Sequence, residues 1–167
     1  WVFGGLGYAA MHGGFYRRNN DVDIFILNND FEKLENVLKD LCEKNNWRMC
    51  KSFLINERPK IEIFINDKEI MSVMPVYKNT ENDTVRFVFR EGYKDYPLDI
   101  LVKQSRSLES YRFQTPRDEF LYALLMDYFL SKNKYPDKRI IDAEYILLPE
   151  DLKRIFPDHS TRRNDVL

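Results

Sequence analysis

Cysteine and histidine are scarce in this chain, which has two of each among 167 residues. These four side chains are too few to build a structural zinc site. They are Cys42, Cys50, His12 and His159. So few cysteines are also typical of reduced thiols in an intracellular protein. We therefore expect a cytoplasmic protein without structural zinc.

Long apolar segments and an excess of charge of one sign are absent as well. No apolar run approaches the roughly 20 residues that span a membrane, and no signal peptide is visible. The formal net charge of −1 gives no argument for or against a nucleic-acid partner. With 44% hydrophobic and 32% charged residues, the composition is that of an ordinary globular protein of one domain. The chain starts at Trp1, directly on an apolar stretch, and we expect that a segment precedes it.

The features that point to chemistry are concentrated near the start of the chain. Asp21 and Asp23 open the apolar run Ile24-Phe25-Ile26-Leu27, which predicts a strand. Because side chains alternate along a strand, both carboxylates point to the same face, where they repel each other. They persist at low cost only with a cation between them, and carboxylate oxygens suit Mg²⁺. The pattern predicts a metal site at Asp21 and Asp23.

A glycine pair supplies a second feature. Gly4 and Gly5 lie between a short apolar start and a predicted helix over residues 6–11. Glycine lets the backbone approach a ligand closely, and the free amides of a helix N-terminus attract phosphate. A phosphate-binding turn combined with a carboxylate metal site is what metal-assisted phosphoryl or nucleotidyl transfer requires.

This arrangement resembles the signature of the DNA polymerase β-like nucleotidyltransferase superfamily, in which Gly-Gly or Gly-Ser and a short helix precede an Asp-x-Asp pair among apolar residues. The form WVFGG…G…RRNNDVDIFI is most similar to the small bacterial nucleotidyltransferases that inactivate aminoglycoside and lincosamide antibiotics. The strong match covers residues 1–27, and a weaker match in element order extends through the helical end. The resemblance implies that a nucleoside triphosphate, ATP first of all, donates its monophosphate to an acceptor hydroxyl with Mg²⁺ or Mn²⁺.

Apolar periodicity predicts the remaining elements. Helices are expected over residues 31–43, from Pro116 through residue 129, and over 138–147 and 149–155, and strands over 48–55, 60–65, 69–76, 84–90 and 98–102. Strands first and helices last predict an α+β fold. By resemblance, it has a small mixed β-sheet flanked by helices. We expect residues 1–115 to form the nucleotidyltransferase core and residues 116–167 a helical segment packed on it as one compact domain.

The resemblance also implies a third carboxylate on a strand beside the aspartate pair. It would hold the metal or take the proton of the attacking hydroxyl. Glu62 and Asp99 both lie between apolar neighbours. Glu62 is favoured, because it follows Asp23 by one helix and two strands, an excursion that returns the chain beside its starting strand. Asp99 is the alternative.

Three basic residues are candidates for binding nucleotide phosphates. Arg17 and Arg18 lie just before the aspartate pair, although a solvated loop would also carry them. Lys138, with Asp142 four residues later, resembles a Lys-x-x-x-Asp element of these enzymes in which the lysine reaches phosphates. An ordinary helical ion pair has the same spacing.

The sequence does not specify the acceptor. By resemblance, a small hydroxylated antibiotic is the first hypothesis, and RNA or a protein, as in toxin-like relatives, is the alternative. A nucleotide-binding module without turnover is a third hypothesis, which three mutually repelling acids disfavour. Aromatic residues from Tyr77 to Tyr96 are candidates for an acceptor pocket, although core packing explains them equally well.

Overall fold

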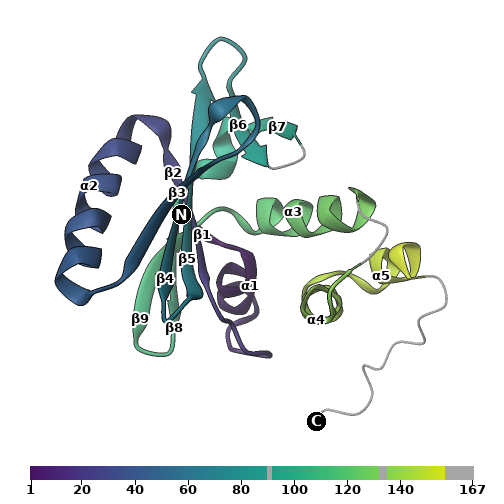
Figure 1. Cartoon of the computed structure of the whole chain (residues 1–167). Coiled ribbons are helices and arrows are strands. Elements are labelled where there is room, and N and C mark those ends of the chain that lie inside the picture. The colour runs from purple at the N-terminus through teal and green to yellow at the C-terminus, as the bar shows by residue number, and fades with distance from the viewer. Residues whose placement is uncertain (90–91, 132–134, 157–167) are drawn as a thin grey trace.

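The computed structural model describes residues 1–89, 92–131 and 135–156, and these form a mixed sheet with helices on both faces. Helix α2 (Asn28–Asn45) covers one face of the sheet, and α1 (Gly4–His12) lies on the opposite side with the later helices (Figure 1). Those helices are α3 (Asp118–Ser131), α4 (Asp137–Ile146) and α5 (Pro149–Ile155). The predicted α+β class with a mixed sheet is confirmed.

The larger sheet has the strand order β1-β2-β5-β4-β3, and β6 and β7 extend it from the far half of β5. Its strands are β1 (Val2–Phe3), β2 (Val22–Leu27), β3 (Arg48–Phe53), β4 (Pro59–Ile65), β5 (Lys68–Asn79), β6 (Thr84–Phe89) and β7 (Gly92–Pro97). Only β2 and β5 pair in parallel among these described strands. The chain therefore passes through α2, β3 and β4 before β5 lies beside β2.

Helix α2 packs through an apolar stripe on the face of the sheet that carries Ile61, Ile63 and Val73. Phe31 and Leu38 are buried side chains of that stripe. Burial of these side chains accounts for the amphipathic pattern that predicts this helix. The helix begins before residue 31 and ends after residue 43, because Asn46 closes it in a left-handed conformation.

The opposite face carries a larger core that is rich in aromatic rings. Phe25 stacks on Phe3 with ring centroids 3.5 Å apart and meets Phe87 edge-on at 4.5 Å. Phe120 of α3 joins them at 4.9 Å from Phe87. Since Asp23 and Phe25 alternate with the side chains that face α2, this is also the face on which the Asp23 carboxylate lies.

The strand predicted over residues 98–102 is wrong. Leu98–Leu101 forms a 3₁₀ helix, η2, and the neighbouring residues Ile100 and Leu101 are both buried. Two adjacent side chains cannot both enter one core from a strand, whereas a helical turn permits it. A second 3₁₀ helix, η1 (Ile55–Glu57), joins β3 to β4.

A separate two-stranded sheet was not predicted. Its strands are β8 (Gln104–Leu108) and β9 (Tyr111–Thr115), joined by a tight turn with Glu109 at positive φ. Their polar side chains hide the apolar alternation that reveals a strand. Within the described residues, no helix is long and apolar enough to cross a membrane.

Candidate active site

Three polar side chains form a row across the middle of the sheet. Asp23 on β2 is in register with Ser72 on β5, and Ser72 is in register with Glu62 on β4. Paired residues of adjacent strands point to the same face, so the two carboxylates lie two strand spacings apart, about 10 Å at the backbone. Parallel pairing of β2 with β5 brings together residues that are far apart in the sequence.

The carboxylate of Asp23 is partly buried beside the β1–α1 turn. Ser72 is 2% exposed, and its hydroxyl donates a hydrogen bond of 2.8 Å to Asp23 Oδ1. Burial raises the pKa of the Asp23 carboxyl, and the nearby charge of Asp21 raises it further, against the opposing effect of the Ser72 hydrogen bond. A cation at this position would relieve both costs.

Glu62 is held by two polar neighbours. Lys60 Nζ lies 2.7 Å from Glu62 Oε1, and the Ser52 hydroxyl donates a hydrogen bond of 3.2 Å to Oε2. The Lys60 and Glu62 side chains are about equally exposed, at 20% and 22%. The lysine therefore keeps the glutamate side chain in place.

The two glycines of the β1–α1 turn have different surroundings. Gly4 has a φ of +63°, and a Cβ there would overlap the Asp23 carboxylate. A Cβ on Gly5 would instead overlap Arg17 and Asn19. The missing Cβ of Gly4 thus allows the start of α1 to contact the Asp23 carboxylate, whereas the missing Cβ of Gly5 leaves space for the loop before β2.

A cleft of about 760 Å³ opens over the row of polar side chains. Its floor contains Gly4, Asp23, Ser72 and Glu62. Its walls combine apolar, aromatic and charged side chains from the sheet and from α3 and α4, and they include Phe53, Leu54, Lys60, Met74, Phe89, Tyr93, Lys94, Tyr96, Leu124, Asp127, Tyr128 and Arg139. A cleft of this size is typical of small-molecule and cofactor sites.

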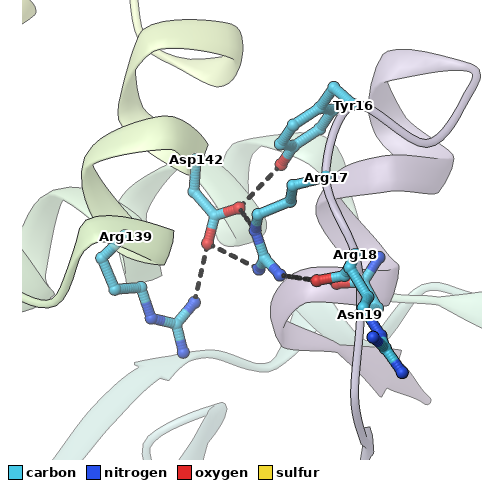
Figure 2. Close-up of polar contacts among 6 residues, drawn as sticks. All are labelled: Tyr16, Arg17, Arg18, Asn19, Arg139 and Asp142. Carbon is cyan, nitrogen blue, oxygen red and sulfur yellow. Dashed lines mark hydrogen bonds and ion pairs between the residues drawn. The ribbon is translucent and has the colours of Figure 1, made fainter.

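The three basic residues predicted to bind phosphate lie outside the cleft lining. Arg17 forms a bidentate ion pair with the buried Asp142, and Figure 2 shows it directed toward α4. Arg18 is exposed on the loop before β2, and Lys138 is exposed on α4. Neither Arg17, Arg18 nor Lys138 is among the side chains that line the cleft.

The cation that α4 contributes to the cleft is Arg139, which sequence reasoning missed. Its side chain is 22% exposed, and its guanidinium lies over the ring of Tyr128 at 5.3 Å from the ring centroid. Its neighbour Lys138 has the predicted spacing to Asp142 but is exposed to solvent. A helix rotates by about 100° per residue, so one position along the chain decides which cation faces the cleft.

Asp99 lies outside the cleft. It is on η2, is 60% exposed and accepts a hydrogen bond of 2.8 Å from Arg117. Of the two candidates for a third carboxylate, Glu62 lines the same cleft as Asp23, whereas Asp99 does not.

The predicted set of three metal-binding carboxylates does not converge in this conformation. Among the described residues, no three histidine, cysteine, aspartate or glutamate side chains are grouped so that they could hold one ion. Glu62 is hydrogen-bonded to Lys60 and Ser52, and it lies two strands away from Asp23 on the same face of the sheet. Asp23 lines the cleft, whereas Asp21 does not, although its charge acts on the Asp23 carboxyl. The metal site at this pair stays a prediction.

Solved structures with a similar fold were found. They include the lincosamide antibiotic adenylyltransferase LnuA with lincomycin bound, at a TM-score of 0.60 and 15% identity over 87% of this chain and 84% of that one. ANT(2'')-Ia in complex with adenylyl-2''-tobramycin has a TM-score of 0.58 and 16% identity over 93% of this chain and 83% of that one. A solution structure of ANT(2'')-Ia gives 0.57 and 15% over 93% and 78%. The fold is thus that of the lincosamide and aminoglycoside nucleotidyltransferases.

Sequence comparison is less informative. No protein-family model matches the chain. Fructose-2,6-bisphosphatase of Saccharomyces cerevisiae is 34% identical over 91 residues, which make up 51% of this chain. The chain spans about a fifth of the length of that curated relative, 20%, so the match does not carry its activity to this chain.

Proposed function

We propose that this chain is a metal-dependent nucleotidyltransferase that transfers AMP from ATP to a hydroxyl of a small acceptor. The observation that carries the proposal is the row of Asp23, Ser72 and Glu62 on the floor of the cleft, beside the Gly4 turn. A fold shared with nucleotidyltransferases supports the same reaction class.

The cation would be Mg²⁺ or Mn²⁺, held by Asp21 and Asp23. The raised pKa of Asp23, caused by burial and by Asp21, supports a site whose charge is balanced by a ligand cation. When bound, such an ion neutralises phosphate charge and lowers the pKa of an oxygen that coordinates to it.

The chain's own residues would bind and align the two reactants. The amides at the start of α1, next to Gly4, are suited to phosphate oxygens, and Arg139 supplies positive charge from the other wall of the cleft. The acceptor oxygen would form a bond to the α-phosphorus as the bond to the bridging oxygen breaks and pyrophosphate leaves. Glu62 would accept the proton of the acceptor hydroxyl, and alignment and charge neutralisation would supply most of the acceleration.

The wall of the cleft supports a small acceptor rather than RNA. Lys60, Lys94 and Arg139 bring positive charge, and Asp23, Glu62 and Asp127 bring an equal formal negative charge. An RNA site would be marked by an excess of basic residues. Tyr93 and Tyr128 line the cleft and give it aromatic surface, as small-molecule sites usually have. The acceptors named in the similar structures, lincomycin and tobramycin, are the first compounds to test.

The deciding experiment offers labelled ATP and the other triphosphates, with Mg²⁺, to a panel of hydroxylated acceptors. We expect AMP transfer in the parent chain and a loss of a hundredfold or more, about 3 kcal/mol, in Glu62→Gln. ATP affinity should be nearly unchanged in that variant.

Asp99→Asn is the matched control for that experiment. It removes a carboxylate that pairs with Arg117 outside the cleft, so turnover should stay near that of the parent. A loss of turnover in Asp99→Asn without one in Glu62→Gln would transfer the proton-accepting role to Asp99. ATP binding without transfer to any acceptor, the chain itself included, would favour a nucleotide-binding module.

A further inference from the structure

A buried ionic cluster joins the loop before β2 to α4. We call the four side chains Tyr16, Arg17, Arg139 and Asp142 the Asp142 cluster (Figure 2). Asp142 is completely buried, at 0% exposure, and Arg17 is 11% exposed. Arg17 donates from Nε and Nη2 to the two carboxylate oxygens, at 2.6 and 2.9 Å, although the two residues are 125 positions apart in the sequence.

The Asp142 carboxylate oxygens accept two further hydrogen bonds. The Tyr16 hydroxyl donates to Asp142 Oδ1 at 2.9 Å, and Arg139 Nη1 donates to Oδ2 at 3.3 Å. Burial and the Asp142 carboxylate together raise the pKa of the Tyr16 hydroxyl, which keeps it protonated as a donor. One carboxylate therefore fixes the direction of two guanidinium groups.

An ion cluster of this kind is not needed simply to hold α4 in place. Well-packed apolar side chains of similar volume stabilise such a contact equally well or better, because ions lose their hydration on burial. What a carboxylate adds is orientation, since it accepts hydrogen bonds only along defined directions. The Asp142 cluster therefore matters through the orientation that it gives to its two arginines.

Both arginines lead to the candidate active site. Arg139 lines the cleft, and its Cζ lies 5.9 Å from the centroid of the Tyr8 ring, which lines the cleft as well. Arg17 Nη1 donates to Asn19 Oδ1 at 2.9 Å, and both side chains fill the space beside Gly5. The cluster thus supports the phosphate-binding turn from one side and presents a cation from the other.

We propose that Asp142 is a positioning residue for the nucleotide, which holds Arg139 toward the triphosphate and Arg17 behind the Gly4-Gly5 turn. The inference rests on the proposed function, because it takes the ligand of the cleft to be a nucleoside triphosphate. It assigns to Asp142 a role in phosphate affinity that its burial alone does not require.

A double-mutant cycle tests this role. Affinities for ATP and AMP, with Mg²⁺, are measured by calorimetry on the parent chain, Asp142→Asn, Arg139→Gln and the double variant. We expect each single variant to bind ATP about tenfold more weakly, as for the loss of one hydrogen bond to a charged group. If Asp142 acts through the Arg139 guanidinium, the double variant should lose little more ATP affinity than either single variant. Its loss should be far smaller than the product of the two single losses. The loss should be smaller for AMP, which carries less phosphate charge.

Two further variants keep the test decisive. Asp151→Asn is the matched control, because it removes a carboxylate that accepts a hydrogen bond from Tyr122 elsewhere in the helical segment, and ATP affinity should not change. Tyr16→Phe removes one hydrogen bond to Asp142 and leaves every charge in place. If Asp142→Asn does not fold, as judged by circular dichroism, Tyr16→Phe takes its place in the cycle with a smaller loss expected.

The outcomes separate the inference from the proposed function. A parent chain that does not bind ATP contradicts both. A parent that binds ATP, with losses in Arg139→Gln but none in Asp142→Asn or Tyr16→Phe, overturns the inference alone. Fully additive losses for Asp142 and Arg139 would also overturn it, because independent effects show that Asp142 does not act through Arg139.

Discussion

Asp23 carries a charge at a position where ionisation is costly. It is partly buried, it receives one hydrogen bond from Ser72, and Asp21 lies close enough to oppose its ionisation. Burial and the charge of Asp21 raise the pKa of Asp23 above the ordinary value of 3.8, and the Ser72 hydrogen bond opposes them only in part. The folded, ligand-free chain therefore binds a proton at this group more readily than the unfolded chain does.

We predict that Asp23→Asn stabilises the ligand-free chain at pH 7. A group whose pKa is raised on folding favours the folded state below 3.8 and loses that contribution as the pH rises through the raised pKa. Asparagine avoids the loss, keeps an oxygen for the Ser72 hydroxyl, and should add on the order of 1 kcal/mol at neutral pH. Denaturation in urea at several pH values measures this, and the gain should shrink as the pH falls.

Asp30→Asn is the control for that prediction. Asp30 is exposed near the start of α2 with a distant ion pair to Lys33, so its replacement should change stability by less than about 0.5 kcal/mol. Equal effects of the two substitutions, or destabilisation by Asp23→Asn without ligand, would contradict the account of Asp23.

Sequence reasoning locates residues that their own neighbours along the chain place on a strand. The alternation around Asp23 and around Glu62 is visible in the sequence, and the structure brings both side chains into one cleft. Whether Lys138 or Arg139 faces the cleft depends instead on the rotation of α4 about its axis. Contacts with Arg17, 125 residues away from Asp142, set that rotation, and no local pattern reports them.

The turn between β1 and α1 is the element whose geometry most constrains the cleft. Gly4 has a left-handed conformation there, and its missing Cβ is the space that the Asp23 carboxylate occupies. The turn and the strand end are thus in direct contact, and neither can shift without the other.

We predict that Gly4→Ala lowers the free energy of unfolding by about 2 kcal/mol or more, because it combines a strained φ with overlap at Asp23. ATP affinity should fall as well, since the Asp23 carboxylate must move. Chemical denaturation and calorimetry measure the two effects on the same protein.

Gly14→Ala is the matched control in the following loop. Nothing lies within 4 Å of a Cβ at Gly14, so the change should stay within about 0.5 kcal/mol of the parent. If Gly4→Ala were as well tolerated as Gly14→Ala, the turn would not constrain Asp23.

Elements were predictable where an apolar pattern was regular, and less so elsewhere. The predicted strand over residues 60–65 agrees closely with β4, and α5 has the predicted bounds. By contrast, η2 was mistaken for a strand because four residues are too few to separate a period of two from a helical turn. The polar hairpin of β8 and β9 is defined by its cross-strand hydrogen bonds, which leave little trace in the composition.

At the scale of the whole molecule, the cleft is bounded by both the sheet and the helical segment. Asp23 and Glu62 come from the sheet, whereas Arg139 comes from α4 and Tyr128 from α3. A ligand that contacts all of them would stabilise the folded state as a whole.

We predict that Mg²⁺ and ATP raise the melting temperature together and far less when added singly. The two side chains Asp21 and Asp23 leave much of an octahedral shell to phosphate oxygens and water, so metal affinity depends on the triphosphate. At a ligand concentration one hundred times Kd, the gain is about 2.7 kcal/mol. Thermal denaturation with ATP, with Mg²⁺, with both, and with both plus EDTA measures it.

Asp21→Asn should remove the part of the shift that depends on Mg²⁺. It should leave the ligand-free melting temperature equal to or slightly above that of the parent, because the Asp23 carboxylate loses a repelling neighbour. An ATP shift of the same size with EDTA as with Mg²⁺ would argue against a metal site at the aspartate pair.

The ion pair between Arg17 and Asp142 also has a consequence for fluctuations of the native state. If α4 separated from the loop that joins α1 to β2, a fully buried carboxylate and its arginine would both lose their partners, so partial opening at this contact is costly. We therefore expect α4 and α1 to open as one cooperative unit in native-state hydrogen exchange, with equal opening free energies and equal denaturant dependence. In Tyr16→Phe the two helices should still exchange together but at lower free energy, whereas unequal protection in the parent chain would mean that each helix opens independently.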